Sequence, residues 1–234
     1  MLIPETLISA AGVQEGNTMT VINAKSKKLK SLSSLLKEAL GEEPVEVTNT
    51  KHLNGVAAGY KHGELIIKGD AGDYLGVLNA GATINLTGNA GKYIADNMTA
   101  GTIIVDKDAG LGAGMYCYGG NLVVRGDAGD FTGTMNKGAT ILVVGNVGAE
   151  AGTYMLAGDL IVVGNAGENF ANYIIRGNVF IGGDWETLGN NTHVVPLSEE
   201  DIEKLRALFE IYKVEAPVTE FKKVVAASEK PFYH

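Results

Sequence analysis

The strongest constraint on the fold is a 19-residue repeat that runs from Gly63 to Asp184 without an insertion. Two rows of aliphatic residues follow this step over seven copies. One row is Leu65, Ile84, Ile103, Leu122, Ile141, Leu160 and Val179, and the other is Ile67, Leu86, Val105, Val124, Val143, Val162 and Ile181. A register of this kind is typical of a solenoid, whose repeats bury their apolar sides only by stacking on one another.

Each repeat combines a short strand with a glycine-rich turn. In the first copy, residues 64–68 alternate, so that Leu65 and Ile67 point into the coil. The pattern has a period of 2 interrupted by turns, and no period of 3.6. We therefore predict an all-β fold: a single-stranded, right-handed parallel β-helix of about seven 19-residue coils, each rising roughly 4.8 Å above the last.

Stacking also predicts ladders of equivalent turn residues. One polar row follows the strands and consists of Asp70, Asn89, Asp108, Asp127, Asn146, Asn165 and Asp184. Asparagine between the aspartates weakens the repulsion that an unbroken stack of carboxylates would suffer. Another row, in the second half of the coil, holds only small residues: Gly76, Ala95, Gly114, Gly133, Gly152 and Ala171.

The flanking regions divide the chain into three parts. Residues 1–62 predict a strand at 19–24, a helix at 31–40, a strand at 45–48 and a partial first coil at 54–63, which is out of the 19-residue frame. Residues 63–184 form the β-helix. Residues 185–234 predict a capping helix at 198–213 and a tail that alternates weakly at 218–225 and ends in Pro231-Phe232-Tyr233.

The predicted C-terminal helix is amphipathic. Ser198 is a suitable N-cap, with Asp201 three residues on. The residues on its apolar side are Ile202, Leu205, Leu208, Phe209 and Tyr212. Because a solenoid leaves an open sheet edge at each end, we expect this helix to cover the last coil.

An outward-facing row of the strands is also apolar, unlike the polar row that begins at Glu64. It consists of Ile66, Asn85, Ile104, Val123, Leu142, Ile161 and Phe180. So long an apolar surface should not face water in a soluble protein. Either the N-terminal strand and helix within residues 19–40 cover it, or another chain does.

Composition excludes several classes of partner. The formal net charge is −8, and the repeat holds twelve Asp and Glu against six Lys and Arg. This balance disfavours nucleic acid and anionic membranes, which need clustered positive charge. The lysine-rich run at residues 24–30 is expected to be a solvated turn. Residues Met1–Gly16 show no signal peptide and no apolar run is long enough to span a membrane, which favours a cytoplasmic location.

No motif predicts a catalytic, cofactor-binding or metal-binding residue, so we expect none of these sites. The single cysteine, Cys117, excludes an internal disulfide and an all-cysteine metal site, and is expected to be buried and inert. The four histidines are scattered; they are His52, His62, His193 and His234. They lie near no cluster with ligand spacing.

Two further motifs resemble binding sites but favour structural interpretations. Residues 110–114 are Gly-Leu-Gly-Ala-Gly, yet no helix follows to hold a dinucleotide phosphate, so a tight corner is expected. The turn carboxylates Asp106, Asp108, Asp127 and Asp130 are expected to bond their own backbone rather than form an acid pair or a cation site.

The repeated Gly-Asp/Asn-Ala-Gly turns and the Met-x-x-Gly corners carry a family resemblance. The corners are Met98–Gly101, Met135–Gly138 and Met155–Gly158. Over roughly residues 45–192 the chain resembles the GXGXG β-helix domain that forms the C-terminal region of the large (alpha) chain of glutamate synthase and that also occurs in formylmethanofuran dehydrogenase. With Leu188-Gly189-Asn190-Asn191 and the following helix, it looks like the stand-alone, archaeal-type form of this domain.

The resemblance implies a non-catalytic scaffolding subunit of an oxidoreductase complex in glutamate biosynthesis and nitrogen metabolism. Its partners would be an amidotransferase subunit, which releases ammonia from glutamine, and an FMN and iron–sulfur synthase subunit, which makes glutamate from 2-oxoglutarate. The chain would hold no cofactor and have no activity alone; a homo-oligomer is left open. The alternatives are a scaffold like the GXGXG subunit of formylmethanofuran dehydrogenase and, from another class, a carbohydrate-binding or lyase β-helix.

Overall fold

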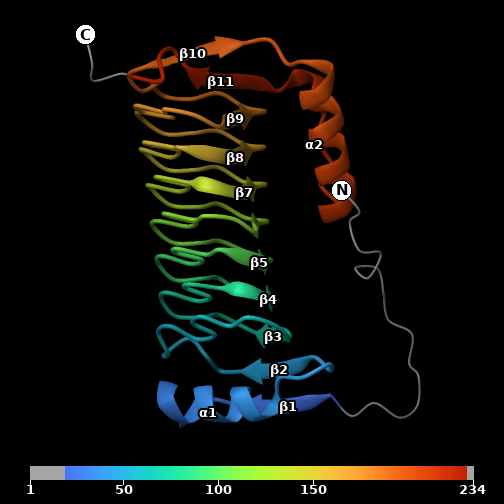
Figure 1. The fold of residues 1–234 in the computed structure, drawn as a ribbon. Coiled ribbons are helices and arrows are strands. Elements are labelled where there is room, and N and C mark those ends of the chain that lie inside the picture. Colours follow the sequence, from blue (N-terminus) through green and yellow to red (C-terminus); the bar gives the residue numbers. More distant parts are fainter. Residues whose placement is uncertain (1–18, 231–234) are drawn as a thin grey trace.

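The computed structural model describes residues 19–230, which form a column of stacked coils with one helix along its side (Figure 1). The strands are β1 (Thr20–Asn23), β2 (Val45–Thr48), β3 (Glu64–Lys68), β4 (Ala80–Leu86), β5 (Ala100–Val105), β6 (Asn121–Val124), β7 (Lys137–Val143), β8 (Ala157–Val162), β9 (Asn178–Ile181), β10 (Thr192–Val195) and β11 (Lys222–Ala226). The helices are α1 (Leu29–Ala39), α2 (Glu199–Tyr212) and the 3-10 helix η1 (Val218–Glu220). The predictions for Met1–Gly16, Pro231-Phe232-Tyr233 and His234 lie outside the described residues.

All strands belong to one sheet, in which β1 to β9 follow one another and β11 and then β10 complete the order. From β1 to β9 each strand pairs in parallel with the next, and between β3 and β4 the register joins Leu65 to Ile84, 19 residues on. A second ladder of parallel bridges runs through the turns from Ala90 to Trp185. The fold is therefore the predicted parallel β-helix.

The two inward rows form the core of the column. Every one of their fourteen side chains is at most 1% exposed. They belong to one cluster that also takes in the alanines of the turn ladder, such as Ala90 and Ala128. The stacked register thus places like residues against like residues, and the repeat buries its apolar side as predicted.

In the second half of each coil the chain turns, and every second residue of the turn has a left-handed backbone conformation. In the first copy of the repeat these are Tyr74, Gly76 and Leu78, with φ of 60°, 62° and 59°. The middle position belongs to the small-residue row, and a Cβ on Gly76 would lie 2.5 Å from Ile103 Cδ1. The row is therefore small because the core leaves no room, whereas Tyr74 and Leu78 on either side are exposed.

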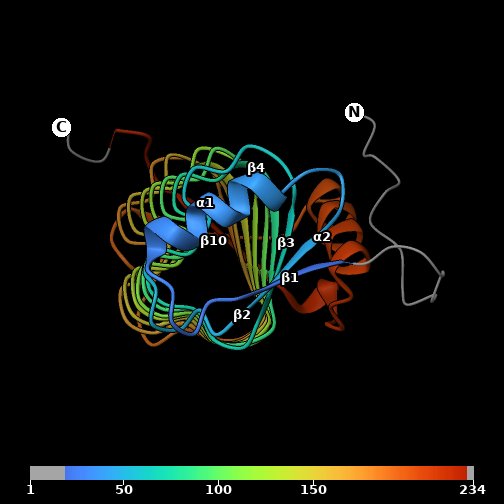
Figure 2. The ribbon, with the colours of Figure 1, turned by 90° about the horizontal axis from the view of Figure 1, so that it is seen from below.

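The N-terminal part extends the column by two strands and closes its lower end. α1 crosses that end and buries Leu32 and Leu36 in the core (Figure 2). The strand predicted at 19–24 is observed as β1, and the helix predicted at 31–40 begins two residues earlier and ends one earlier.

The frame predicted for residues 54–63 was wrong. Asp73 N donates to Asn54 Oδ1 across 19 residues, so this segment already follows the repeat. The strand before it is displaced by one residue, because Val45 pairs with Leu65. One extra residue therefore lies between Thr48 and Asn54, and the strand, rather than the turn, is out of frame.

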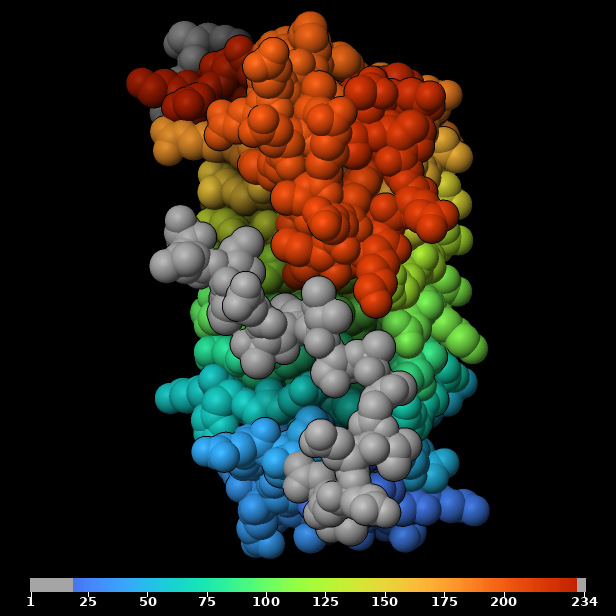
Figure 3. All heavy atoms as spheres, turned by 90° about the vertical axis from the view of Figure 1, so that its right-hand side faces the viewer, coloured from blue at the N-terminus to red at the C-terminus, as the bar shows by residue number. Residues whose placement is uncertain are grey.

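α2 does not cover the last coil; it lies along the outer face of the sheet (Figures 1 and 3). Its N-terminus has the predicted capping box: Ser198 Oγ accepts from Asp201 N (3.1 Å), and Asp201 Oδ2 accepts from Ser198 N (2.9 Å). The open edge at β9 is instead paired by β11, which runs antiparallel to it. A strand can satisfy the free backbone groups of a sheet edge, which the side of a helix cannot.

The outward apolar row is covered by α2 and the segment after it. Val123, Leu142, Ile161 and Phe180 are at most 1% exposed and share a cluster with helix residues Leu205, Phe209 and Tyr212 and with Val218 and Phe221. The lower members, Ile66, Asn85 and Ile104, are partly buried. We expected either residues 19–40 or another chain to cover this row. The upper half is instead covered by the chain's own C-terminal helix.

Candidate functional site

The single cysteine lies in the core of the column. Cys117 is fully buried, and its Sγ donates to Ala95 O at 3.0 Å. Burial raises the pKa of the thiol to about 12, so the nucleophilic thiolate does not form near neutral pH. The prediction that Cys117 is buried is confirmed.

The histidines lie in different parts of the molecule. A ring nitrogen of His52 is 3.2 Å from Lys27 O, His62 lines a small cavity beside α1, and His193 lies in β10. Within residues 19–230, no group of three or more His, Cys, Asp or Glu side chains is placed to hold a metal ion. The structure thus brings the described histidines to no common site.

The turn carboxylates were predicted to bond their own backbone, and this was wrong. Asp108, Asp127 and Asp130 accept from backbone amides of the next coil, and Asp106 pairs with a side chain. In the polar row, each Oδ1 accepts the amide hydrogen of the residue 19 positions on, at 2.7–3.2 Å in all six steps from Asp70 to Asp184. Asp130 Oδ1 accepts from Ala149 N in the same way, and Asp106 pairs with Arg125 at 3.4 Å. These carboxylates connect one coil to the next.

Residues 110–114 form a corner of the solenoid, as expected. Gly112 and Gly114 have left-handed φ of 75° and 69°. A Cβ on Gly114 would lie 2.7 Å from Ile141 Cδ1, so the glycine is required by the core. The next regular element is strand β6, and no helix begins here to bind a phosphate.

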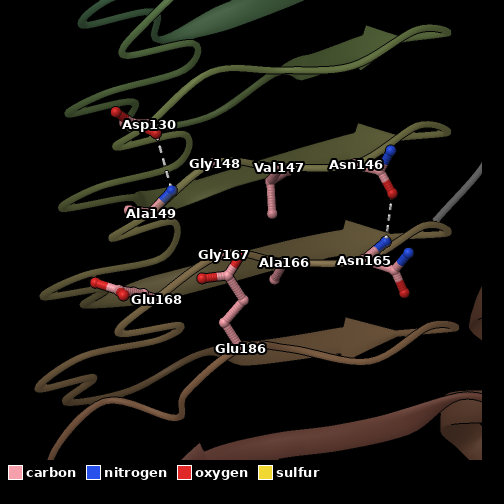
Figure 4. A pocket seen from close by; sticks show the side chains of 10 residues that line it. All are labelled: Asp130, Asn146, Val147, Gly148, Ala149, Asn165, Ala166, Gly167, Glu168 and Glu186. Atoms are coloured by element: carbon pink, nitrogen blue, oxygen red, sulfur yellow. Dashed lines mark hydrogen bonds between the residues drawn. The ribbon is translucent and has the colours of Figure 1, made fainter.

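An open groove of about 520 Å³ lies along the turns of the last coils (Figure 4). Its lining residues are Asp130, Asn146, Val147, Gly148, Ala149, Asn165, Ala166, Gly167, Glu168 and Glu186. The glycines form its floor because a Cβ on Gly167 would lie 2.9 Å from Ala149 N. The groove is therefore a consequence of close coil stacking.

The groove contains carboxylates but no side chain that could act together with them in catalysis. Asp130 is engaged by Ala149 N, and Asn146 Oδ1 accepts from Asn165 N at 2.9 Å (Figure 4). Glu168 and Glu186 are exposed, and no basic or nucleophilic side chain is among the lining residues. This arrangement provides neither an activated nucleophile nor an acid–base pair.

A more unusual surface lies at the left-handed turns, on the side of the column away from α2 (Figures 1 and 2). We call it the corner surface; it consists of Tyr74, Leu78, Tyr116, Tyr118, Phe131 and Met135. Leu78 is 55% exposed and Tyr118 53%. All except Tyr118 have φ between 54° and 60°. A large side chain at a left-handed position carries a conformational cost, and Tyr74, Leu78 and Phe131 are exposed as well, which makes this surface a candidate for binding.

Sequence reasoning found only part of the corner surface. The sequence places Tyr74, Tyr93 and Phe131 in one row of the repeat, but the row four residues on was missed. The same 19-residue step links Gly59, Leu78, Asn97, Tyr116 and Met135, and each has left-handed φ. The glycine and asparagine in this row could have revealed the left-handed positions from sequence, because these residues favour that conformation.

Comparison with protein families gives a match that spans most of the chain. The model of the GXGXG motif family matches residues 45–230. A search of curated proteins found no match. In the described part of the chain, neither α1 nor α2 has the length and apolar character needed to cross a membrane.

Proposed function

Because the chain belongs to the GXGXG motif family, we propose that it is a non-catalytic scaffolding subunit of a glutamate synthase-type complex in the cytoplasm. In this role it spaces an amidotransferase subunit from an FMN and iron–sulfur subunit. The observation that carries the proposal is the extent of the family match: residues 45–230 include the coils, α2 and β11. The family character therefore belongs to the column from β2 onward with its covering helix.

The geometry of the column supports a spacing role. The seven repeats at roughly 4.8 Å each account for about 30 Å of the height of the column, and β1 and β2 add to it. Side-chain ladders add to the sheet hydrogen bonds, and three polar contacts fix α2 to the body: Lys204–Asp159 (3.2 Å), Lys223–Asp201 (2.8 Å) and Arg125 Nη1 to Tyr212 O (3.0 Å). A body held in this way keeps attached subunits at a fixed separation.

The corner surface is the face that we propose for a partner subunit. α2 covers the upper half of the outward apolar row, so that row is not free to dock a partner along its length. The corner surface carries exposed apolar side chains, among them Leu78 (55% exposed) and Phe131 (39%). The turns between the strands lie on the side of the column away from α2 (Figure 1). A basic residue, Lys137, lies beside the corner surface: its Nζ donates to Tyr118 OH (2.9 Å) and lies 4.2 Å from the centre of that ring.

Affinity purification of the native protein tests the proposal. We expect the chain to retain a flavin- and iron–sulfur-containing partner and an amidotransferase, identified by visible absorbance and by mass spectrometry. Recovery of the chain alone, from cells that express both enzymes, would contradict the proposed function.

A double variant in the same experiment tests the docking face. Leu78→Asn and Met135→Asn remove apolar side chains at left-handed positions where asparagine is well tolerated, as Asn97 of the same row shows (φ 56°). We expect wild-type folding and a loss of partner of tenfold or more. Ile211→Asn, on the exposed side of α2 (42% exposed), is the matched control and should retain the partner. Equal recovery by both variants would rule out the corner surface as the docking face.

A further inference from the structure

Besides the 19-residue step, the column shows a longer repeat of three coils. The lengths of the strands show it: β4, β5 and β6 have 7, 6 and 4 residues, and β7, β8 and β9 again have 7, 6 and 4. The pairing shows it as well, because the register shifts after Ala80 and again after Lys137, 57 residues on. The structural unit is therefore three coils, or 57 residues.

Two buried asparagines mark the same position in successive units. Asn79 and Asn136 are 57 residues apart, and both are fully buried. Asn79 Oδ1 accepts from Ala82 N (3.1 Å) and its Nδ2 donates to Ala82 O (2.9 Å). Asn136 makes the same two bonds with Ala139, at 2.9 Å and 2.8 Å. Residues 57 positions apart are thus equivalent in their surroundings as well as in their place within a coil.

The corner surface repeats with this three-coil unit. Tyr74 and Phe131, 57 residues apart, are 40% and 39% exposed, and both have φ of 60°. Leu78 and Met135, also 57 apart, have φ of 59° and 54°. We call Tyr74 with Leu78, and Phe131 with Met135, the corner pairs. Large apolar side chains at left-handed positions outside the core are costly, so core packing does not explain why both pairs are present.

Other turn positions outside the core differ between the units. Residues 57 apart there include Lys92 and Ala149, Tyr93 and Glu150, and Leu111 and Glu168. The next position equivalent to the corner pairs falls on Leu188 and Thr192, in the closing coil. Leu188 packs against the core, and Thr192 Oγ1 donates to Gly189 O (2.6 Å). Within the repeat, two like apolar pairs therefore face outward.

Three coils at roughly 4.8 Å each place the corner pairs about 14 Å apart. Two separate subunits do not fit at this spacing, because a domain of 100 residues already has a radius of gyration of about 13 Å. One interface of standard size, about 800 Å² on each partner, covers both pairs. We propose that a single partner subunit contacts both corner pairs, through two like apolar elements at the same spacing. This inference rests on the proposed docking of a partner on the corner surface.

The test is a titration of full-length chains with the partner subunit that co-purifies with the wild-type chain from native cells. Leu78→Asn changes one corner pair and Met135→Asn changes the other, at left-handed positions that suit asparagine. We expect each variant to raise the Kd about threefold and the double variant about tenfold, because the effects of contacts more than about 10 Å apart add as free energies. Native mass spectrometry should give one such partner per column.

Tyr154→Asn is the matched control. Tyr154 lies in the same row as Leu78 and Met135, has φ of 55° and is 37% exposed, but its equivalent 57 residues earlier is Asn97. It should bind the partner as wild type does. A weakening confined to one of the two variants, an equal weakening in Tyr154→Asn, or two partner molecules per column would overturn this inference and leave the proposed function standing. An unchanged Kd in both variants would overturn the docking face as well, and a wild-type chain recovered alone would overturn the proposed function itself.

Discussion

The Val124→Asp variant is expected to be unfolded at room temperature. Val124 is fully buried in an inward row and lies between Val105 and Val143 of the neighbouring strands. An unpaired carboxylate there costs on the order of 4 kcal/mol or more, a large part of the about 5–15 kcal/mol that stabilises a typical domain. Far-UV circular dichroism and a thermal melt would detect the loss of the sheet.

Asn121→Asp is the matched control for this variant. Asn121 lies on the same strand but faces outward, beside Thr102 and Thr140, and the change adds a carboxylate with almost no change in shape. It should melt close to wild type. If Val124→Asp also melted within a few degrees of wild type, the assignment of the inward rows would be wrong.

The Phe209→Asp variant is expected to release α2 from the column while the coils stay folded. Phe209 is 5% exposed, lies in the cluster with Leu142, Ile161 and Phe180, and packs at a tilt on Phe221 with ring centres 5.5 Å apart. A carboxylate in this cluster costs about 3 kcal/mol or more, but detachment of the helix allows it to reach water. The change should therefore be local.

Limited proteolysis and hydrogen exchange distinguish local release from global unfolding. We expect protease cleavage and fast exchange in α2, with protected amides in β4 to β8. The control is Ile211→Asp on the exposed side of the same helix, which should keep α2 protected. Loss of protection throughout the coils would show that α2 is needed for the column to fold.

The repeat made the column predictable because one physical requirement, stacking of equal coils, governs each of its residues. The inward position of Leu65 and Ile67 follows from alternation, and their burial follows from the step of 19. The carboxylates of the polar row were predicted as structural from residue type. The groups that donate to them lie on the next coil, as Asn89 N does for Asp70. These donors follow from the stacked geometry and cannot be predicted from residue type alone.

The placement of α2 was not predictable in the same way. Its apolar side was evident from the spacing of Leu205 and Phe209, but two surfaces needed covering: the open edge of the last coil and the outward apolar row. The alternation at 218–225 was too weak to show that β11 pairs with that edge. Once a strand takes the edge, the apolar row is the surface left for the helix.

The corner surface and the burial of Tyr60 depend on backbone conformation and packing that the sequence does not display. Leu78 and Met135 are unusual only because their φ is positive, a property that residue type does not predict for large side chains. Tyr60 packs against the core, and its hydroxyl is buried without a hydrogen-bond partner among residues 19–230. Its place in the same row as Asn79, 19 residues on, becomes visible once residues 54–63 are in the correct frame.

The most direct test of the scaffolding role is glutamate synthesis measured with two nitrogen sources in native cells depleted of this chain. A spacer that couples the amidotransferase to the synthase is needed for ammonia from glutamine to reach the second site, but not for added ammonia. We predict that glutamine-dependent synthesis falls at least tenfold, while ammonia-dependent synthesis stays near wild type. Unchanged glutamine-dependent synthesis would contradict the account.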